Sequence, residues 1–115
     1  MSGVIYERVA LIGLGLIGSS LSHVIRREKL AEHIAGHARS AETRAIARRI
    51  GLADTVHESA AACVRDADLV ILCIPVGAYG KVAEEISAHL KPGATLSDVG
   101  SVKSAVVRDV GRAEA

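Results

Sequence analysis

The sequence contains almost no aromatic side chains of the kind that fill large cores. Its 115 residues include no tryptophan, no phenylalanine and two tyrosines, Tyr6 and Tyr79. Half of the residues are hydrophobic nonetheless, so a core has to be built from Ala, Val, Ile and Leu. An aliphatic core of this kind is typical of parallel strands covered by helices on both faces, and it disfavours an aromatic-rich barrel.

Features of membrane, secreted and nucleic-acid-binding proteins are missing as well. No apolar run approaches the roughly 18 residues that cross a bilayer, and residues 1–7 lack the regions of a signal peptide. The 14 basic and 13 acidic side chains nearly cancel, and without a basic arm we expect no nucleic-acid partner. The two cysteines, Cys63 and Cys73, make no disulfide framework, and we interpret both as buried thiols of a cytoplasmic protein.

What the sequence does contain is a regular alternation of strand and helix patterns. Short apolar runs predict strands, and apolar residues at helical spacing between serine caps and glycine stops predict helices. The expected strands are residues 9–12, 33–37, 55–56, 68–74 and 94–99; the expected helices follow Gly18, Ser40, Ser59 and Pro75, and a last one follows Ser101. With right-handed crossovers this order predicts one domain, residues 1–115, built on a doubly wound α/β sheet of strand order 3-2-1-4-5.

A glycine motif stands between the first expected strand and helix, in the stretch RVALIGLGLIGSSLSHVIRR. Its spacing, Gly-x-Gly-x-x-Gly, is the dinucleotide-binding fingerprint of a Rossmann fold when it lies in this context. Gly13 would permit a tight turn, Gly15 would let a pyrophosphate approach the backbone, and Gly18 would let the helix pack closely. The N–H groups of Leu16 and Ile17 would then face the anion. The alternative is a glycine-rich turn that serves packing alone.

In folds of this kind, the residues at the end of the second strand determine the preference for NAD or NADP. A carboxylate at that place would bind a ribose 2′-hydroxyl, but the residues here are Ala38, Arg39 and Ser40. Arg39 together with the Ser40 hydroxyl could bind a 2′-phosphate, which favours NADP over NAD. Two other interpretations stay open: Arg39 stacks on adenine or is simply solvated, and Ser40 only caps a helix.

With the loop, GHARS, LVILCIPVGAYG and LKPGATLSDVGSVK in view, the chain resembles the N-terminal half of the prephenate/arogenate (cyclohexadienyl) dehydrogenase family. The resemblance runs from about Val9 to Val107, and DVGSVK, residues 98–103, is its most specific part. It implies the cofactor domain of an enzyme of tyrosine biosynthesis that oxidatively decarboxylates prephenate or arogenate with NADP or NAD.

The same resemblance assigns further site residues. Ile74, Pro75 and Val76 would border the nicotinamide ribose, and Ser101 would lie beside the nicotinamide as a catalytic residue. The Ser101 hydroxyl would form a hydrogen bond with the substrate hydroxyl or with the family's catalytic histidine. Ser101 would equally serve as a helix cap, and both roles can hold together. Lys103 would either serve structure or charge near the site or be a solvated helix residue, and we favour the solvated residue.

The chain departs from the family in what it lacks. The family's catalytic histidine follows another strand in a His-Pro-like motif, whereas all histidines here precede Ser101: His23, His33, His37, His57 and His89. The helical domain that makes the family's homodimer and binds the substrate side chain is also absent. We therefore expect dinucleotide binding without turnover from these residues alone, and no metal site.

Two other interpretations are kept. One is the cofactor domain of a different dehydrogenase, of the 3-hydroxyacid or pyrroline-carboxylate reductase type, against which DVGSVK argues. The other is a non-catalytic module that senses nicotinamide nucleotides, which the lack of a catalytic acid or base would suit.

Overall fold

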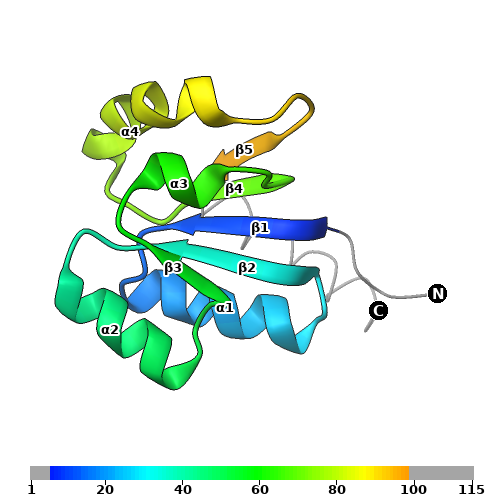
Figure 1. Cartoon of the computed structure of the whole chain (residues 1–115), viewed down its shortest axis with the longest axis vertical. Helices are drawn as coiled ribbons and strands as arrows, with labels where there is room; N and C mark the ends of the chain where they lie inside the picture. The colour runs from blue at the N-terminus through cyan, green and yellow to red at the C-terminus, as the bar shows by residue number, and fades with distance from the viewer. Residues whose placement is uncertain (1–5, 99–115) are drawn as a thin grey trace, which may run out of the picture.

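A single parallel β-sheet organises the chain. The computed structural model describes residues 6–98. The strands in that range are β1 (Tyr6–Ile12), β2 (Ala31–His37), β3 (Thr55–His57), β4 (Leu69–Leu72) and β5 (Thr95–Asp98). All neighbouring pairs are parallel and the order is β3-β2-β1-β4-β5 (Figure 1). The predicted doubly wound topology of order 3-2-1-4-5 is confirmed.

Helices cover both faces of this sheet. They are α1 (Leu16–Arg27), α2 (Ala41–Ile50), α3 (Ala60–Val64) and α4 (Tyr79–Ile86), with single 3-10 turns at Val76–Ala78 and Ser87–His89. Figure 1 shows α1 and α2 on one side of the sheet and α3 and α4 on the other. Within residues 6–98, no helix has the length and apolarity that a bilayer crossing requires.

The helix ends follow the predicted caps. The Ser40 hydroxyl accepts a hydrogen bond from the Thr43 N–H (3.3 Å), and the Ser59 hydroxyl accepts one from the Ala62 N–H (3.1 Å). Gly51 ends α2 in the left-handed conformation, with φ of 70°. These short polar side chains satisfy donors that a helix cannot pair internally, and glycine supplies the positive φ without strain.

Two aliphatic clusters form the core, one on each face of the sheet. Val9, Leu11 and Ile71 point toward α1 and α2, whereas Ala10 and Val70 point toward α3 and α4. All four residues of β4 are buried, as expected for a strand covered on both faces. The expectation of an aliphatic core is therefore confirmed in the described residues.

The cysteines only partly match their prediction. Cys63 is fully buried, and burial raises the pKa of its thiol to about 12. Cys73 is only partly buried, although burial raises the pKa of its thiol to about 11. The prediction of two buried thiols is thus wrong for Cys73, which directly follows Leu72, the last residue of β4.

Strand limits differ from the expected ones at both ends of the sheet. β1 begins at Tyr6 rather than at residue 9, because the Tyr6 N–H donates to the Leu30 carbonyl and the strand pairs with β2 from Ala31 on. β4 extends over Leu69–Leu72 and is therefore shorter than the expected residues 68–74. The α4 helix gives way to a 3-10 turn at Ser87. The last expected helix lies outside the described residues.

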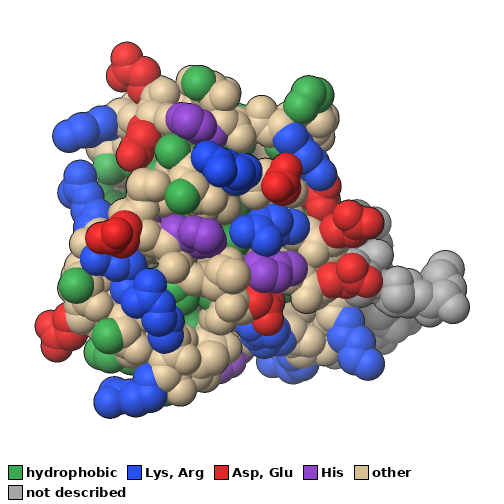
Figure 2. Space-filling view, viewed as in Figure 1, with side chains coloured by type: hydrophobic (Ala, Val, Ile, Leu, Met, Phe, Trp, Pro, Cys, Tyr) green, Lys and Arg blue, Asp and Glu red, His purple; other side chains and the backbone are tan. Residues whose placement is uncertain are grey.

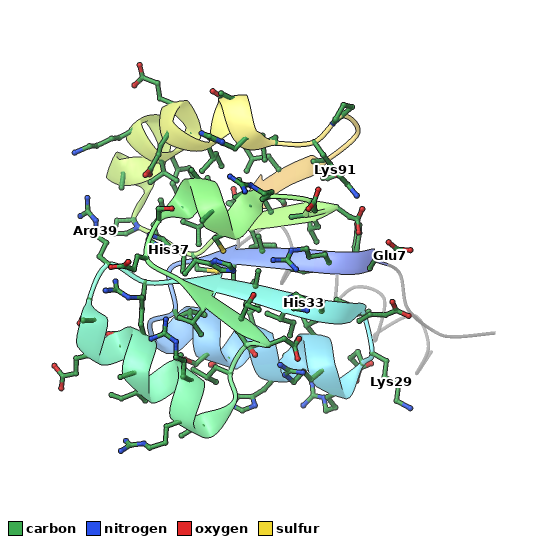
Figure 3. The ribbon with its side chains drawn as sticks, in the orientation of Figure 1. Glu7, Lys29, His33, His37, Arg39 and Lys91 are labelled. Atoms are coloured by element: carbon green, nitrogen blue, oxygen red, sulfur yellow. The ribbon has the colours of Figure 1, made fainter. Side chains whose placement is uncertain are left out.

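Asp68 joins three segments at the amino ends of the strands. Its carboxylate accepts hydrogen bonds from the Glu7 and Arg8 N–H groups (3.0 Å each) and forms an ion pair with Lys91. The hydrogen bond from Lys91, followed by the one from the Arg8 N–H, lowers the pKa of Asp68. Figure 3 shows Glu7 and Lys91 at this end of the sheet.

This clamp predicts a pH-dependent contribution to stability. Because the pKa of Asp68 is lower in the folded chain, its contribution is complete above the unfolded value, about 3.9, and is lost as the pH falls through the folded value. Asp68→Asn keeps an acceptor but loses the charge, so it should unfold at lower urea concentration than wild type at pH 7. The difference should narrow steadily below about pH 4. An equal difference at pH 7 and pH 3 would contradict the assignment.

Candidate functional site

The strand order reverses at the carboxyl ends of β1 and β4. From β1, the chain passes to β2 and β3 on one side, and β4 and β5 lie on the other. Ligands of open α/β sheets bind in the crevice at such a switch point. His37 and Arg39 lie at this end of the sheet in Figure 3, opposite Glu7 and Lys91.

Gly13 makes the turn that leaves β1. Its φ of +102° is strained for any residue with a side chain. A Cβ at this position would also stand 2.8 Å from the Cys73 carbonyl oxygen and 3.0 Å from Cγ2 of Ile74. The Gly13 N–H donates to the His37 carbonyl (2.8 Å), which ties the turn to β2. Gly13 therefore adopts the tight turn expected from the sequence.

Two other glycines allow close packing around the loop. A Cβ on Gly18 would collide with the Gly13 carbonyl oxygen, so its absence brings α1 against the end of β1. Gly36 in β2 makes room for the buried Leu14 side chain, whose Cδ1 would be 2.6 Å from an added Cβ. The sequence reasoning missed Gly36. Its signal was a glycine inside an expected strand, which often marks such a close approach.

Gly15 differs from the other two glycines of the motif, Gly13 and Gly18, because no protein atom crowds it. Its φ is −74° with an extended ψ, a conformation open to any residue, and an added Cβ would meet no protein atom within 4 Å. Gly15 is exposed and is the N-cap residue of α1, so this helix start has no capping side chain. Nor is there an acidic residue in the first turn, where Leu16 and Ile17 lie. Protein packing therefore explains Gly13 and Gly18 but leaves Gly15 unexplained.

Several predicted site residues meet in one small cavity next to the loop. Its volume is about 140 Å³. The residues around it are Ile12, Gly13, His37, Arg39, Ile74, Pro75, Ala78, Lys81 and Val82. The glycine turn, the end of β2 and the segment after β4 thus share one site, although they lie far apart in the sequence.

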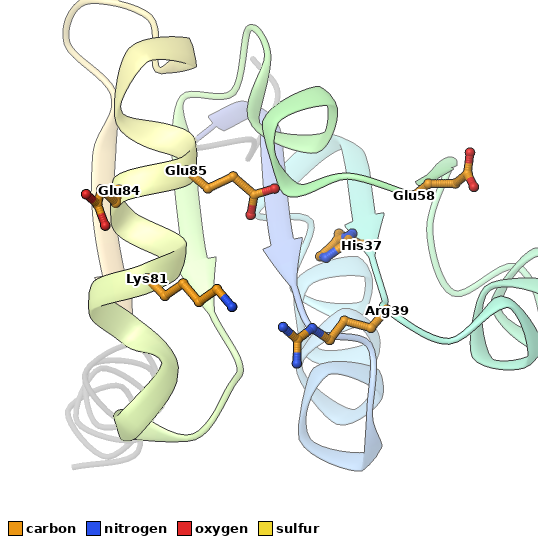
Figure 4. Close-up of a pocket in the computed structure, with 6 residues that line it drawn as sticks. All are labelled: His37, Arg39, Glu58, Lys81, Glu84 and Glu85. Atoms are coloured by element: carbon orange, nitrogen blue, oxygen red, sulfur yellow. The ribbon is translucent and has the colours of Figure 1, made fainter.

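A wider cleft of about 580 Å³ adjoins this cavity, with His37, Arg39 and Lys81 in its lining too. Three acids, Glu58, Glu84 and Glu85, complete it (Figure 4). Acidic and basic side chains are also mixed over the face of the molecule seen in Figure 2. The charge in the cleft is therefore divided rather than of one sign.

Arg44 holds the turn that carries Arg39. Its Nη1 donates to the carbonyl oxygens of Ala38 (2.7 Å) and Arg39 (2.8 Å). Its Nη2 also pairs with Glu58, at 3.8 Å. Sequence reasoning missed this residue, because no sequence pattern indicates that the side chain of a helical arginine binds carbonyl oxygens of the preceding turn.

Ser40 and the residues after β4 have different surroundings. The Ser40 hydroxyl caps α2, which agrees with the simpler interpretation of that residue. Ile74 is half-buried and Pro75 is exposed, and Val76 begins a 3-10 turn. Ser101 and Lys103 lie outside the described residues, so the roles assigned to them stay predictions.

Histidines near β3 are held in structural contacts. His33 Nε2 and His57 Nε2 both contact the Thr55 hydroxyl, at 3.1 and 3.0 Å. Burial, with the charge of Arg8 next, lowers the pKa of both imidazoles. Among residues 6–98 no group of His, Cys, Asp and Glu side chains has a metal-binding arrangement.

The glycines provide a test that needs no ligand. Gly18→Ala should lower the free energy of unfolding by about 1–3 kcal/mol, because its methyl group meets the Gly13 carbonyl. Gly15→Ala should change it by less than about 0.5 kcal/mol, because its methyl group points into open space. Urea unfolding followed by circular dichroism measures both. Equal losses in the two variants would show that Gly15 is needed for packing after all.

The sequence matches the family described as prephenate dehydrogenase, nucleotide-binding domain, over residues 21–114. The cyclohexadienyl dehydrogenase of Zymomonas mobilis is 38% identical over 104 residues, which are 90% of this chain and 36% of that protein. The chain thus spans about a third of the length of this relative. The match favours the prephenate dehydrogenase family over the other dehydrogenase families considered from the sequence.

Solved structures with the same fold carry related names. The prephenate dehydrogenase of Aquifex aeolicus, in complex with hydroxyphenyl propionate and NAD+, aligns with a TM-score of 0.73 and 27% identity, over 80% of this chain and 32% of that one. The arogenate dehydrogenase of Synechocystis aligns with a TM-score of 0.72 and 28% identity, over 79% of this chain and 32% of that one.

Proposed function

This chain belongs to the prephenate dehydrogenase family as a nucleotide-binding domain, and from that premise we propose that its glycine loop binds NAD(P). Gly15 is the observation that carries the proposal. It is the one glycine of the motif that the protein's own packing does not require. It also stands at the uncapped start of a 12-residue helix, where N–H groups and the helix dipole favour an anion.

The residues present fit the parts of a dinucleotide. The pyrophosphate would lie against Gly15 and the N–H groups of Leu16 and Ile17, with Gly18 keeping α1 close. The adenosine would enter the small cavity that Gly13 and Arg39 line. Its walls include apolar side chains such as Ile12 and Val82, as suits a base.

The other half of the cofactor would extend toward β4. Ile74, Pro75 and Val76, at the carboxyl end of that strand, would border the nicotinamide ribose. A bound nicotinamide would accept the hydride that leaves the substrate ring. Ser101 would then hold its hydroxyl beside that ring and hydrogen-bond the substrate hydroxyl.

For the whole protein we propose oxidative decarboxylation of prephenate or arogenate in tyrosine biosynthesis. The names of the relatives support this, since one is a cyclohexadienyl dehydrogenase and another a prephenate dehydrogenase bound to NAD+. A homodimer and a cytoplasmic location stay predictions for that protein. The chain's own contribution is to bind the cofactor and orient it at the switch point.

NADP is proposed as the preferred cofactor. No carboxylate stands at the end of β2, where Ala38 is buried, and Arg39 reaches the cleft from the next position. A guanidinium can bind a ribose 2′-phosphate through two hydrogen bonds, whereas a carboxylate would repel it. Arg44, which holds this turn through two carbonyl oxygens, would orient Arg39 for that contact.

Calorimetric titration of the chain with NAD+ and NADP+ tests the proposal. Wild type should bind both. Gly15→Ala should bind each at least about tenfold more weakly, because its methyl group occupies the space that the pyrophosphate needs. The same substitution is expected to leave the fold stable, because an added Cβ at Gly15 meets no protein atom within 4 Å. Unchanged affinity in Gly15→Ala, or no binding by wild type, would contradict the assignment of the loop.

A second titration tests the turn after β2. Arg44→Met should weaken NADP+ binding several-fold, because the Ala38 and Arg39 carbonyls lose the guanidinium that holds them. Its helical content should stay that of wild type by circular dichroism. Equal NADP+ affinity in the two proteins would mean that the turn keeps its shape without Arg44.

A further inference from the structure

Lys81 provides a second cation at the cavity beside the glycine loop. It lies in α4, on the opposite side of the cleft from the turn after β2. Lys81 lines the same cavity as Gly13 and Arg39, and its side chain is exposed. Figure 4 shows the Lys81 and Arg39 side chains pointing toward one another across the opening. Two elements that follow different strands thus present positive charge to one space.

Neither cation forms a salt bridge within the described part of the chain. The salt bridges there use Arg26, Arg27, Arg44 and Lys91 as their cations. Arg39 and Lys81 form none, although both line a cleft that also contains carboxylates. An anion from outside the protein would complete this arrangement.

The position of Lys81 in its helix points the same way. Lys81 is the third residue of α4, in a first turn that contains no acidic residue. A cation there opposes the positive end of the helix dipole, whereas the first turn of α2 holds Glu42, the favoured sign. The unfavourable placement is offset when an anion lies between the ammonium group and the helix start.

The acids of the cleft restrict where that anion can lie. Glu58 pairs with Arg44 on the side of α2, and Glu84 and Glu85 follow Lys81 by three and four residues on α4. All three line only the wider cleft, and none lines the smaller cavity. Repulsion from them would favour a position for the anion between Arg39 and Lys81, on the side of the smaller cavity.

We propose that Lys81 is a second specificity residue for the cofactor and that it binds, with Arg39, a phosphate monoester on the adenosine ribose. The pyrophosphate is already accounted for at Gly15, so the ligand here is the 2′-phosphate of NADP. Arg39 supplies a planar pair of donors and Lys81 a compact charge from the other side. The inference rests on the proposed function of the loop. It adds to Arg39, in the turn after β2, a second cofactor-binding residue from α4.

Titration of the whole 115-residue chain with two ligand pairs tests this assignment. NADP+ and 2′,5′-ADP carry the 2′-phosphate, whereas NAD+ and 5′-AMP do not. Lys81→Gln should weaken both phosphate-bearing ligands by about tenfold and the other two by less than about twofold. Arg49→Gln is the matched control, because it removes one exposed positive charge from α2 away from both cavities. It should change none of the four affinities.

Each contrary result has a distinct meaning. An unchanged ratio of NADP+ to NAD+ affinity in Lys81→Gln overturns the role of Lys81 while leaving the loop assignment intact. The same holds if all four ligands weaken equally, which is a general charge effect, or if wild type binds NAD+ but not 2′,5′-ADP. Failure of wild type to bind NAD+ and NADP+ alike overturns the proposed function and this inference together.

Discussion

The close approach of α1 to the end of β1 is the contact on which the site depends. It requires a residue without a side chain at Gly18, because any Cβ there would strike the Gly13 carbonyl. It also requires the positive φ of Gly13 and the seating of Leu14 over Gly36. Together these direct the uncapped start of α1 into the crevice where the strand order reverses. The packing of α1 against β1 thus leaves the positive end of this helix without a capping side chain or an acidic residue in its first turn.

That crevice is divided by charge and by polarity. Arg39, from the turn after β2, and Lys81, from α4, face a small and largely apolar cavity, and the acids line only the wider cleft beyond it. On the side of β4, Ile74 and Pro75 continue the apolar lining. A dinucleotide likewise combines a flat base, charged phosphates and a nicotinamide ring. The proposed assignment therefore draws on several segments of the chain rather than on the glycine motif alone.

Much of this architecture could be predicted from local patterns. Helix caps can be predicted from residue type alone, as they are for the N-caps Ser40 and Ser59 and the C-cap Gly51. The apolar run of β4 likewise indicates a strand buried on both faces. The contacts of Arg44 and the proposed role of Lys81 could not be found in the same way, because both depend on where the fold places distant segments. The partial exposure of Cys73 could not be predicted for a related reason, since it depends on how later segments pack around the end of β4. Ser101 lies outside the described residues and keeps its assignment from family resemblance alone.

Amide chemical-shift mapping of the ¹⁵N-labelled chain during an NADP+ titration tests the central claim most directly. The account predicts that the largest shifts fall on the amides of Gly15, Leu16 and Ile17, with a second group around Arg39 and Lys81. Strand residues at the amino ends of the sheet, near Asp68, should hardly move. Shifts centred on the amino ends, or no shifts at saturating NADP+, would contradict a dinucleotide site at this helix start.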